Sequence, residues 1–272
     1  MNFLIRFGCH GSTWELDYDK ETDYLSSITE TVDVAGFESI DIQVSLLGRF
    51  KNSPLALKKE LESRNLKLAA LTIPFSWKEL QESEEEKAKA NYYIDYVQNF
   101  KGAILNIAPR VLENKNQLSE KQDNIINCAN NLAKRALIQG VDCSFHPSSP
   151  ENAPFRSPED YQRLFEGLNS AYIGYTPDAG HIMMGGMNVL NTFEKYREWI
   201  KHVHFKDASS NMEWKKMGTG EIQFVEIVKY LKATHYSGWI MMEEETDESS
   251  NNPAQAINDI SKYIKRNLIP LL

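Results

Sequence analysis

Most residues that could do chemistry lie in one short stretch in the second half of the chain. Two apolar runs each end in polar side chains: the first delivers Asp178 and His181, the second His202, His204 and Lys206. The last three are spaced two apart, so they share one face if the run is a strand. Two imidazoles and an ammonium on a buried face need polar partners, a cation or a substrate. We therefore expect a metal or acid–base site here, with a chance cluster at a solvated edge as the alternative.

Alternating strand-like and helical segments must position these residues. The strand-like runs cover residues 2–8, 37–43, 66–73, 102–108, 141–146, 171–175, 202–205 and 238–242. The helical segments cover residues 21–35, 55–63, 84–100, 119–139, 157–168, 189–199, 224–234 and 253–267. Eight such units, without a linker rich in Pro, Gly or Ser, predict an α/β fold: a single (β/α)8 TIM barrel domain over residues 1–272. An open doubly wound sheet is the alternative, but the sequence lacks the Gly-rich phosphate loop that this fold uses.

The polar side chains follow the carboxyl ends of the runs, which form the catalytic face of a barrel. Asp178, His204 and Glu243, with His146 as a fourth, give a mixed oxygen and nitrogen ligand set. Such a set suits Mn²⁺, Co²⁺, Fe²⁺ or Zn²⁺ better than Ca²⁺. Each residue also has a simpler interpretation: a helix cap for Asp178, a solvated acid for Glu243, and a donor behind the ligands for His146. Their shared placement favours the metal site.

Three further residues at the ends of the first two runs are expected to contact a substrate: His10, Trp14 and Asp41. Trp14 and Trp77 are candidates for an apolar wall against the substrate, because an indole offers a flat hydrophobic face. A position in the core or at the rim is the alternative for each tryptophan.

Composition excludes some classes of function. The net charge is −8 and no basic run occurs, which disfavours a protein that tracks nucleic-acid phosphates. No apolar run is long enough for a membrane span, and the N-terminal one is too short for a signal peptide. The cysteines are Cys9, Cys128 and Cys143, which form neither a zinc pair nor an even disulfide set. We therefore expect a cytoplasmic protein in a reducing setting.

The motifs together resemble those of the xylose-isomerase-like barrels, the sugar isomerase/epimerase superfamily. The sixth-run sequence Asp-Ala-Gly-His resembles the family's Asp-Thr-Gly-His, and the seventh-run sequence His-Val-His-Phe-Lys-Asp resembles its His-Val-His-x-Lys-Asp. The sequence Gly-Thr-Gly-Glu-Ile from Gly218 is similar to the family's following turn, and the last run ends in Glu243, like its ligand glutamate. The second-run sequence Gly-Phe-Glu-Ser-Ile-Asp, which ends at Asp41, is similar to the family's second strand.

Within this superfamily the motifs most resemble those of the inosose dehydratases. Phe145-His146-Pro147 resembles their fifth-strand His-Pro-His or His-His-His, although the third position is Ser148 here. The ketose 3-epimerases place a glutamate on the fifth strand, and His146 stands in that position. Two-base epimerisation then requires His146 as the second base opposite Glu243. A histidine can act as a general base near neutral pH. A one-base isomerase or dehydratase needs no such replacement.

The resemblance implies a metal-dependent isomerase or epimerase of sugars or polyols, or alternatively an inosose-dehydratase-like lyase. Such an enzyme takes a proton next to a carbonyl and passes through a metal-stabilised enediolate. Glu243 and His146 are then the expected bases, with Lys206 or His181 as the group that protonates oxygen. The implied metal is Mn²⁺ or Co²⁺, with Zn²⁺ or Mg²⁺ as alternatives. Barrels of this family often pair, so a homodimer is one expectation.

Two other classes of function remain open. One is a barrel that has lost catalysis and binds a sugar or a partner, which His146 in place of glutamate favours. The other is DNA repair, since an endonuclease branch shares the fold. The acidic net charge and the count of six histidines oppose a multi-zinc site that binds DNA.

Overall fold

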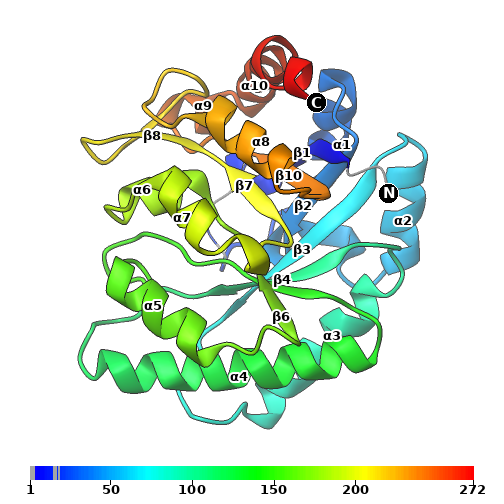
Figure 1. The fold of residues 1–272 in the computed structure, drawn as a ribbon. Coiled ribbons are helices and arrows are strands. Elements are labelled where there is room, and N and C mark those ends of the chain that lie inside the picture. Colours follow the sequence, from blue (N-terminus) through cyan, green and yellow to red (C-terminus); the bar gives the residue numbers. More distant parts are fainter. Residues whose placement is uncertain (1–3, 15–16, 18) are drawn as a thin grey trace.

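The fold is a curled sheet of eight parallel strands with helices on its outside, as the computed structural model of residues 4–14, 17 and 19–272 shows (Figure 1). The strands are β1 (Ile5–His10), β2 (Ser39–Gln43), β3 (Lys67–Phe75), β4 (Ile104–Pro109), β5 (Cys143–Phe145), β6 (Ile173–Tyr175), β7 (Val203–Phe205) and β10 (Gly238–Met242). Their order across the sheet is β6-β5-β4-β3-β2-β1-β10-β7. The two outer strands meet through isolated parallel bridges that join Tyr175 to Ile200 and Asp178 to His204. The expected (β/α)8 barrel is confirmed.

The helices follow the strands along the chain. They are α1 (Leu25–Ala35), α2 (Pro54–Glu62), α3 (Glu84–Val97), α4 (Leu118–Ile138), α5 (Pro158–Gly167), α6 (Ala179–Met184), α7 (Val189–Lys195), α8 (Phe224–Ala233), α9 (Asp247–Asn251) and α10 (Pro253–Asn267). Local sequence sets several of their ends. Ser157 and Asp160 form a capping box at the start of α5, and Gly36 ends α1 in the left-handed conformation with φ of 82°.

The expected segments are present, with shifted ends. The helix expected from residue 21 begins at Leu25, and the backbone N–H of Thr22 before it bonds to the carbonyl of Ser45. The helix expected over residues 189–199 is divided, since Tyr196 leaves the helical conformation and a 3-10 turn follows at Arg197–Trp199. Residues 2 and 3 of the first expected strand lie outside the described residues.

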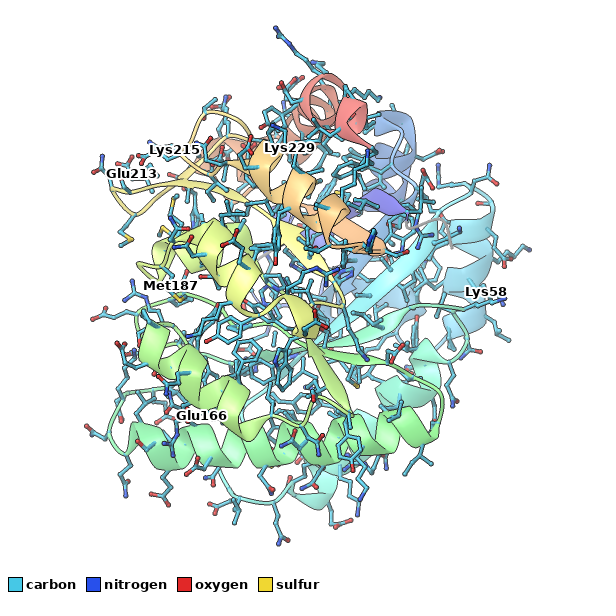
Figure 2. The ribbon with its side chains drawn as sticks, in the orientation of Figure 1. Lys58, Glu166, Met187, Glu213, Lys215 and Lys229 are labelled. Carbon is cyan, nitrogen blue, oxygen red and sulfur yellow. The ribbon has the colours of Figure 1, made fainter. Side chains whose placement is uncertain are left out.

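The sequence patterns do not predict two additions at the catalytic face. One is the short helix α9, and the other is an antiparallel hairpin of β8 (Asp207–Ser209) and β9 (Glu213–Lys215). Figure 2 labels Glu213 and Lys215 on this hairpin, where the two side chains form an ion pair at 2.5 Å. Among the described residues, no helix has the length and hydropathy needed to cross a membrane.

Candidate metal and acid–base centre

The carboxyl ends of the strands bring most of the expected site residues together. These residues are His10, Asp41, His146, Asp178, His181, His204, Lys206 and Glu243. All eight side chains are buried or nearly so, because the strands that carry them face the inside of the barrel. A buried set of four histidines, one lysine and three carboxylates requires internal pairing or a bound ion.

The alternation expected on the seventh strand is confirmed. His202 and His204 each donate from Nε2 to the same oxygen, Oδ2 of Asp41, at 3.0 and 2.8 Å. Lys206 continues the same face, with its Nζ 3.5 Å from Asp178. Burial by itself would raise the pKa of Asp41, but these histidines and His10 hold it far below its usual range.

Asp41 corrects one expectation. We expected a substrate contact, but its side chain is 0% exposed and is surrounded by protein hydrogen-bond partners. Its Oδ1 accepts from the hydroxyl of Thr72, whose oxygen accepts from the carboxamide of Asn106. Thr176 donates to the Asn106 carbonyl or to Ser144. Asp41 therefore belongs to a polar layer below the site and orients His204 from behind.

Asp178 caps a helix, as one of its two interpretations expected, and it also directs a free oxygen to the centre. Its Oδ1 accepts from the backbone N–H of His181 at 2.9 Å and so caps α6. Its Oδ2 is buried and has no hydrogen-bond partner among the described residues. This oxygen lies 3.7 Å from Nε2 of His146 and 3.5 Å from Nζ of Lys206. One oxygen is thus structural, and the other faces the centre.

His146 is a second buried group without a partner. Neither ring nitrogen forms a hydrogen bond to any described residue. Its ring centre lies 4.8 Å from that of His204 and 5.6 Å from that of His181. Burial lowers the pKa of His146, so the imidazole is neutral, which is the form that binds metals.

The donor atoms fit a divalent cation. One donor atom from each of His146, Asp178 and His204 lies within 4.8 Å of the others. Nδ1 of His204 also has no partner and lies 3.4 Å from Oε1 of Glu243. The separations of 3.7 Å between His146 and Asp178 and of 3.4 Å between His204 and Glu243 suit donors of one ion with metal–ligand bonds of about 2.0–2.2 Å. These four groups face one point and could therefore hold the ion, with His204 releasing its Nδ1 proton as the metal binds.

Lys206 supplies the only buried ammonium among the described residues that face this centre. Its Nζ donates to Glu245 at 2.6 Å and to Nε2 of His181 at 3.2 Å, and it lies 4.6 Å from the ring centre of Trp214. Burial alone would lower the pKa of Lys206, but Asp178, Glu243 and Glu245 raise it well above its usual value. Lys206 therefore stays protonated.

His181 is neutral beside this ammonium. Burial and the charge of Lys206 lower the pKa of His181 to about 3. Because Nε2 accepts from Lys206, the ring proton lies on Nδ1, 2.8 Å from the hydroxyl of Ser149. Lys206, His181 and Ser149 thus form a hydrogen-bonded row beside the metal donors.

Glu243 also faces the centre, with its Oε1 3.9 Å from Nζ of Lys206. The hydroxyl of Ser12 donates to its Oε2, and Nδ1 of His10 lies 3.2 Å from the same oxygen. Burial alone would raise the pKa of Glu243, but Lys206 and His10 hold it well below the usual range. Glu243 is therefore an ionised carboxylate with Oε1 directed to the centre.

The two tryptophans do not join the centre. Trp14 packs against the hydrophobic core, and no ring contact or hydrogen bond joins it to the site residues in the described part of the chain. Trp77 is 1% exposed and stacks on Phe75 at 4.3 Å, so it is a core residue and cannot form a wall. The alternative interpretation of Trp77 is the correct one.

A cavity of about 450 Å³ opens over the centre. Its lining includes His146, His181 and Glu245, together with Gln43 and Arg110 from neighbouring strand ends. Sequence reasoning missed Glu245 and Ser12 as site residues. Ser12 follows His10 and Glu245 follows Glu243 by two positions, but both lie beyond the ends of their strands, so strand alternation gave no signal for either.

Known proteins resemble this chain along most of its length. The family model described as xylose isomerase-like TIM barrel matches residues 30–267. An inosose dehydratase of Bacillus velezensis is 27% identical over 275 residues, covering 90% of this chain and 89% of that protein. An inosose dehydratase of Clostridium botulinum is 25% identical and covers 92% and 91% of the two chains.

Solved structures share the fold at lower identity. The IOLI protein with a bound zinc atom has a TM-score of 0.73 at 16% identity and covers 96% of both chains. An L-ribulose 3-epimerase has a TM-score of 0.74 at 16% identity and covers 98% of this chain and 96% of that one.

Proposed function

Because this chain belongs to the xylose isomerase-like TIM barrel family, we propose that it is a lyase that removes water from a keto sugar or keto polyol. Inosose dehydratases, at 22 to 28% identity over nearly the whole chain, support this class of substrate and reaction. Dehydration next to a carbonyl needs one group that takes a proton from carbon and one that assists the departure of a hydroxyl.

The asymmetry of the centre carries the proposal. Glu243 is an ionised carboxylate and Lys206 is a protonated ammonium, and the two face the same centre with 3.9 Å between Nζ and Oε1. His146 replaces the second carboxylate that a two-base epimerase of this family would use. One base and one cationic donor match an elimination.

A divalent ion would fit the donors of His146, Asp178 and His204, with Glu243 Oε1 beside them at 3.4 Å from Nδ1 of His204, and we place Mn²⁺ or Co²⁺ ahead of Zn²⁺ and Mg²⁺. Bound there, the ion would polarise the substrate carbonyl and an adjacent hydroxyl. The mixed carboxylate and imidazole set distinguishes this site from one for Ca²⁺.

The protein side chains perform the proton transfers. Glu243 takes the proton from the carbon next to the carbonyl, and Ser12 and His10 hold its other oxygen in place. The proton that Glu243 has taken passes to the departing hydroxyl, which leaves as water and returns Glu243 to the carboxylate. Lys206 donates a hydrogen bond to the oxygen that becomes negative, since its ammonium keeps its proton at neutral pH. His181 and Ser149 keep Lys206 directed to the centre.

Epimerisation or isomerisation is the second candidate, because His146 offers a neutral imidazole with both nitrogens free. It could act as the second base opposite Glu243.

Turnover in D₂O separates the candidates. The full chain, loaded with Mn²⁺ or Co²⁺, is incubated with inososes and with ketohexoses, and the masses of the products are measured by mass spectrometry. A lyase gives a product lighter by one water, whereas an epimerase gives deuterium at carbon with no loss of water. Glu243→Gln should abolish either reaction. Metal analysis and melting curves with EDTA accompany the assay, and a chain that binds no metal and turns over neither substrate would refute the proposal.

A further inference from the structure

The amino-terminal face of the barrel, opposite the catalytic centre, carries a cationic groove. The groove has a volume of about 740 Å³ and is lined by Arg6, Lys58, Lys67 and Lys101, with Glu62 as its one acidic side chain. This excess of positive charge occurs in a chain whose net charge is −8. A concave surface lined by one sign of charge concentrates ions of the opposite sign.

The four cations come from different parts of the fold. Arg6 lies on β1, Lys58 on α2, Lys67 at the start of β3, and Lys101 in the loop before β4. Figure 2 labels Lys58 on α2. Because tertiary structure brings these residues to one groove, their charges are concentrated in space without a basic run in the sequence.

None of the four cations makes an ion pair with another described residue, although lysines elsewhere, such as Lys229 and Lys262, pair with carboxylates. Arg6 is the most constrained of them. Its guanidinium lies 3.9 Å from the ring centre of Trp239, and its Nε is buried with no hydrogen-bond partner in the described part of the chain. A stacked guanidinium with a free donor is held in place for an anionic acceptor.

We propose that this groove binds a small molecule that carries a phosphate-type dianion. Arg6 supplies the fixed donor, and the three lysines supply mobile ammonium groups that can close on the phosphate oxygens. The site is separate from the catalytic centre and does not depend on the reaction proposed above. It lies at the opposite ends of the strands that carry His10 and Glu243.

Isothermal titration of the full chain with inorganic pyrophosphate, in EDTA, tests the proposal. Saturable binding should occur at one site and weaken as NaCl is raised. The double substitution Lys58→Gln with Lys101→Gln should weaken it at least tenfold, as should Arg6→Gln. The two lysines are exposed, so their variant keeps the fold even if Arg6→Gln disturbs the packing on Trp239.

Matched variants test whether pyrophosphate binds elsewhere on the protein. Lys87→Gln removes an exposed helical lysine outside the groove and should change affinity less than twofold. Lys89→Gln removes a cation at the catalytic rim near Arg110 and should also leave binding unchanged. Absence of saturable binding, equal losses in all variants, or loss only in Lys89→Gln would each overturn the proposal. Binding of a polyglutamate peptide without binding of pyrophosphate would overturn it as well and would indicate a protein partner.

Discussion

His204 donates from Nε2 to Asp41 at 2.8 Å, which leaves Nδ1 as the ring nitrogen that faces Glu243. The carboxylate of Asp41 therefore fixes the orientation of His204 and holds the proton on Nε2, so that Nδ1 is the nitrogen available to a metal. Because Asp41 is inaccessible to solvent, its negative charge interacts with the surrounding side chains and not with water. The donor geometry at the end of β7 thus depends on a residue of β2.

Asp41→Asn should weaken Mn²⁺ or Zn²⁺ binding about 10- to 100-fold, the usual effect of losing the partner of a ligand histidine. The neutral carboxamide cannot hold two imidazoles as strongly as the carboxylate does. Isothermal titration measures the change. Asp142→Asn, which breaks an exposed ion pair with Lys201, is the matched control and should have no effect. Unchanged affinity in Asp41→Asn would contradict the orienting role.

The metal-free protein should lose stability between pH 6.5 and 10. Burial alone would lower the pKa of His204, but its hydrogen bond to Asp41 and the nearby carboxylate of Glu243 raise it from 6.5 to about 10. A raised pKa in the folded state stabilises the protein fully below pH 6.5, and the contribution disappears as pH rises through 10. Urea unfolding in EDTA across this range measures the free energy of unfolding. His204→Gln should flatten the pH dependence, whereas substitution of the exposed His235 by Gln should not.

Lys206→Met should destabilise the metal-free protein by about 3–5 kcal/mol, since it leaves buried carboxylates without their cation. The same variant should gain more stability from Mn²⁺ than the parent does, because the metal restores the lost positive charge near Asp178 and Glu243. Melting curves with and without metal measure both effects. Turnover should fall by about 10²–10³, the usual loss for a donor to developing charge. Lys206→Arg, which keeps the charge, is the control, and equal metal responses in both variants would contradict this account.

His146→Glu should lower stability without metal and raise metal affinity. The new carboxylate would lie near Asp178 in a buried site, which costs free energy until a cation compensates the two charges. It would also supply a second carboxylate base, so deuterium exchange at substrate carbon should increase relative to loss of water. His146→Gln is the control, because it removes the imidazole without adding the negative charge that His146→Glu introduces. If His146→Glu binds metal no better than His146→Gln does, then residue 146 lies outside the ligand set.

Sequence patterns predicted the strands, the barrel and the polar cluster, because alternation on a strand fixes which side chains share a face. His204 and Lys206 illustrate this on β7. The role of Asp41 could not be predicted, since its distance from His204 depends on barrel closure and on a register shift between Ile40 and Asp41. The cationic groove escaped prediction for the same reason, because its residues are scattered along the chain.

The bridges that join β6 to β7 include Asp178 and His204 themselves. The seam that completes the barrel is short, and two of its residues are donors in the candidate metal centre. A ligand that binds both residues therefore also resists the separation of these strands, so binding affinity and the free energy of local opening are linked. Amide protons along the seam should exchange with solvent more slowly when the centre is occupied. The seam between β6 and β7 would then be the part of the empty barrel that opens most easily, and it is also the part that carries the candidate site. A bound metal would make this seam open and close together with the rest of the barrel.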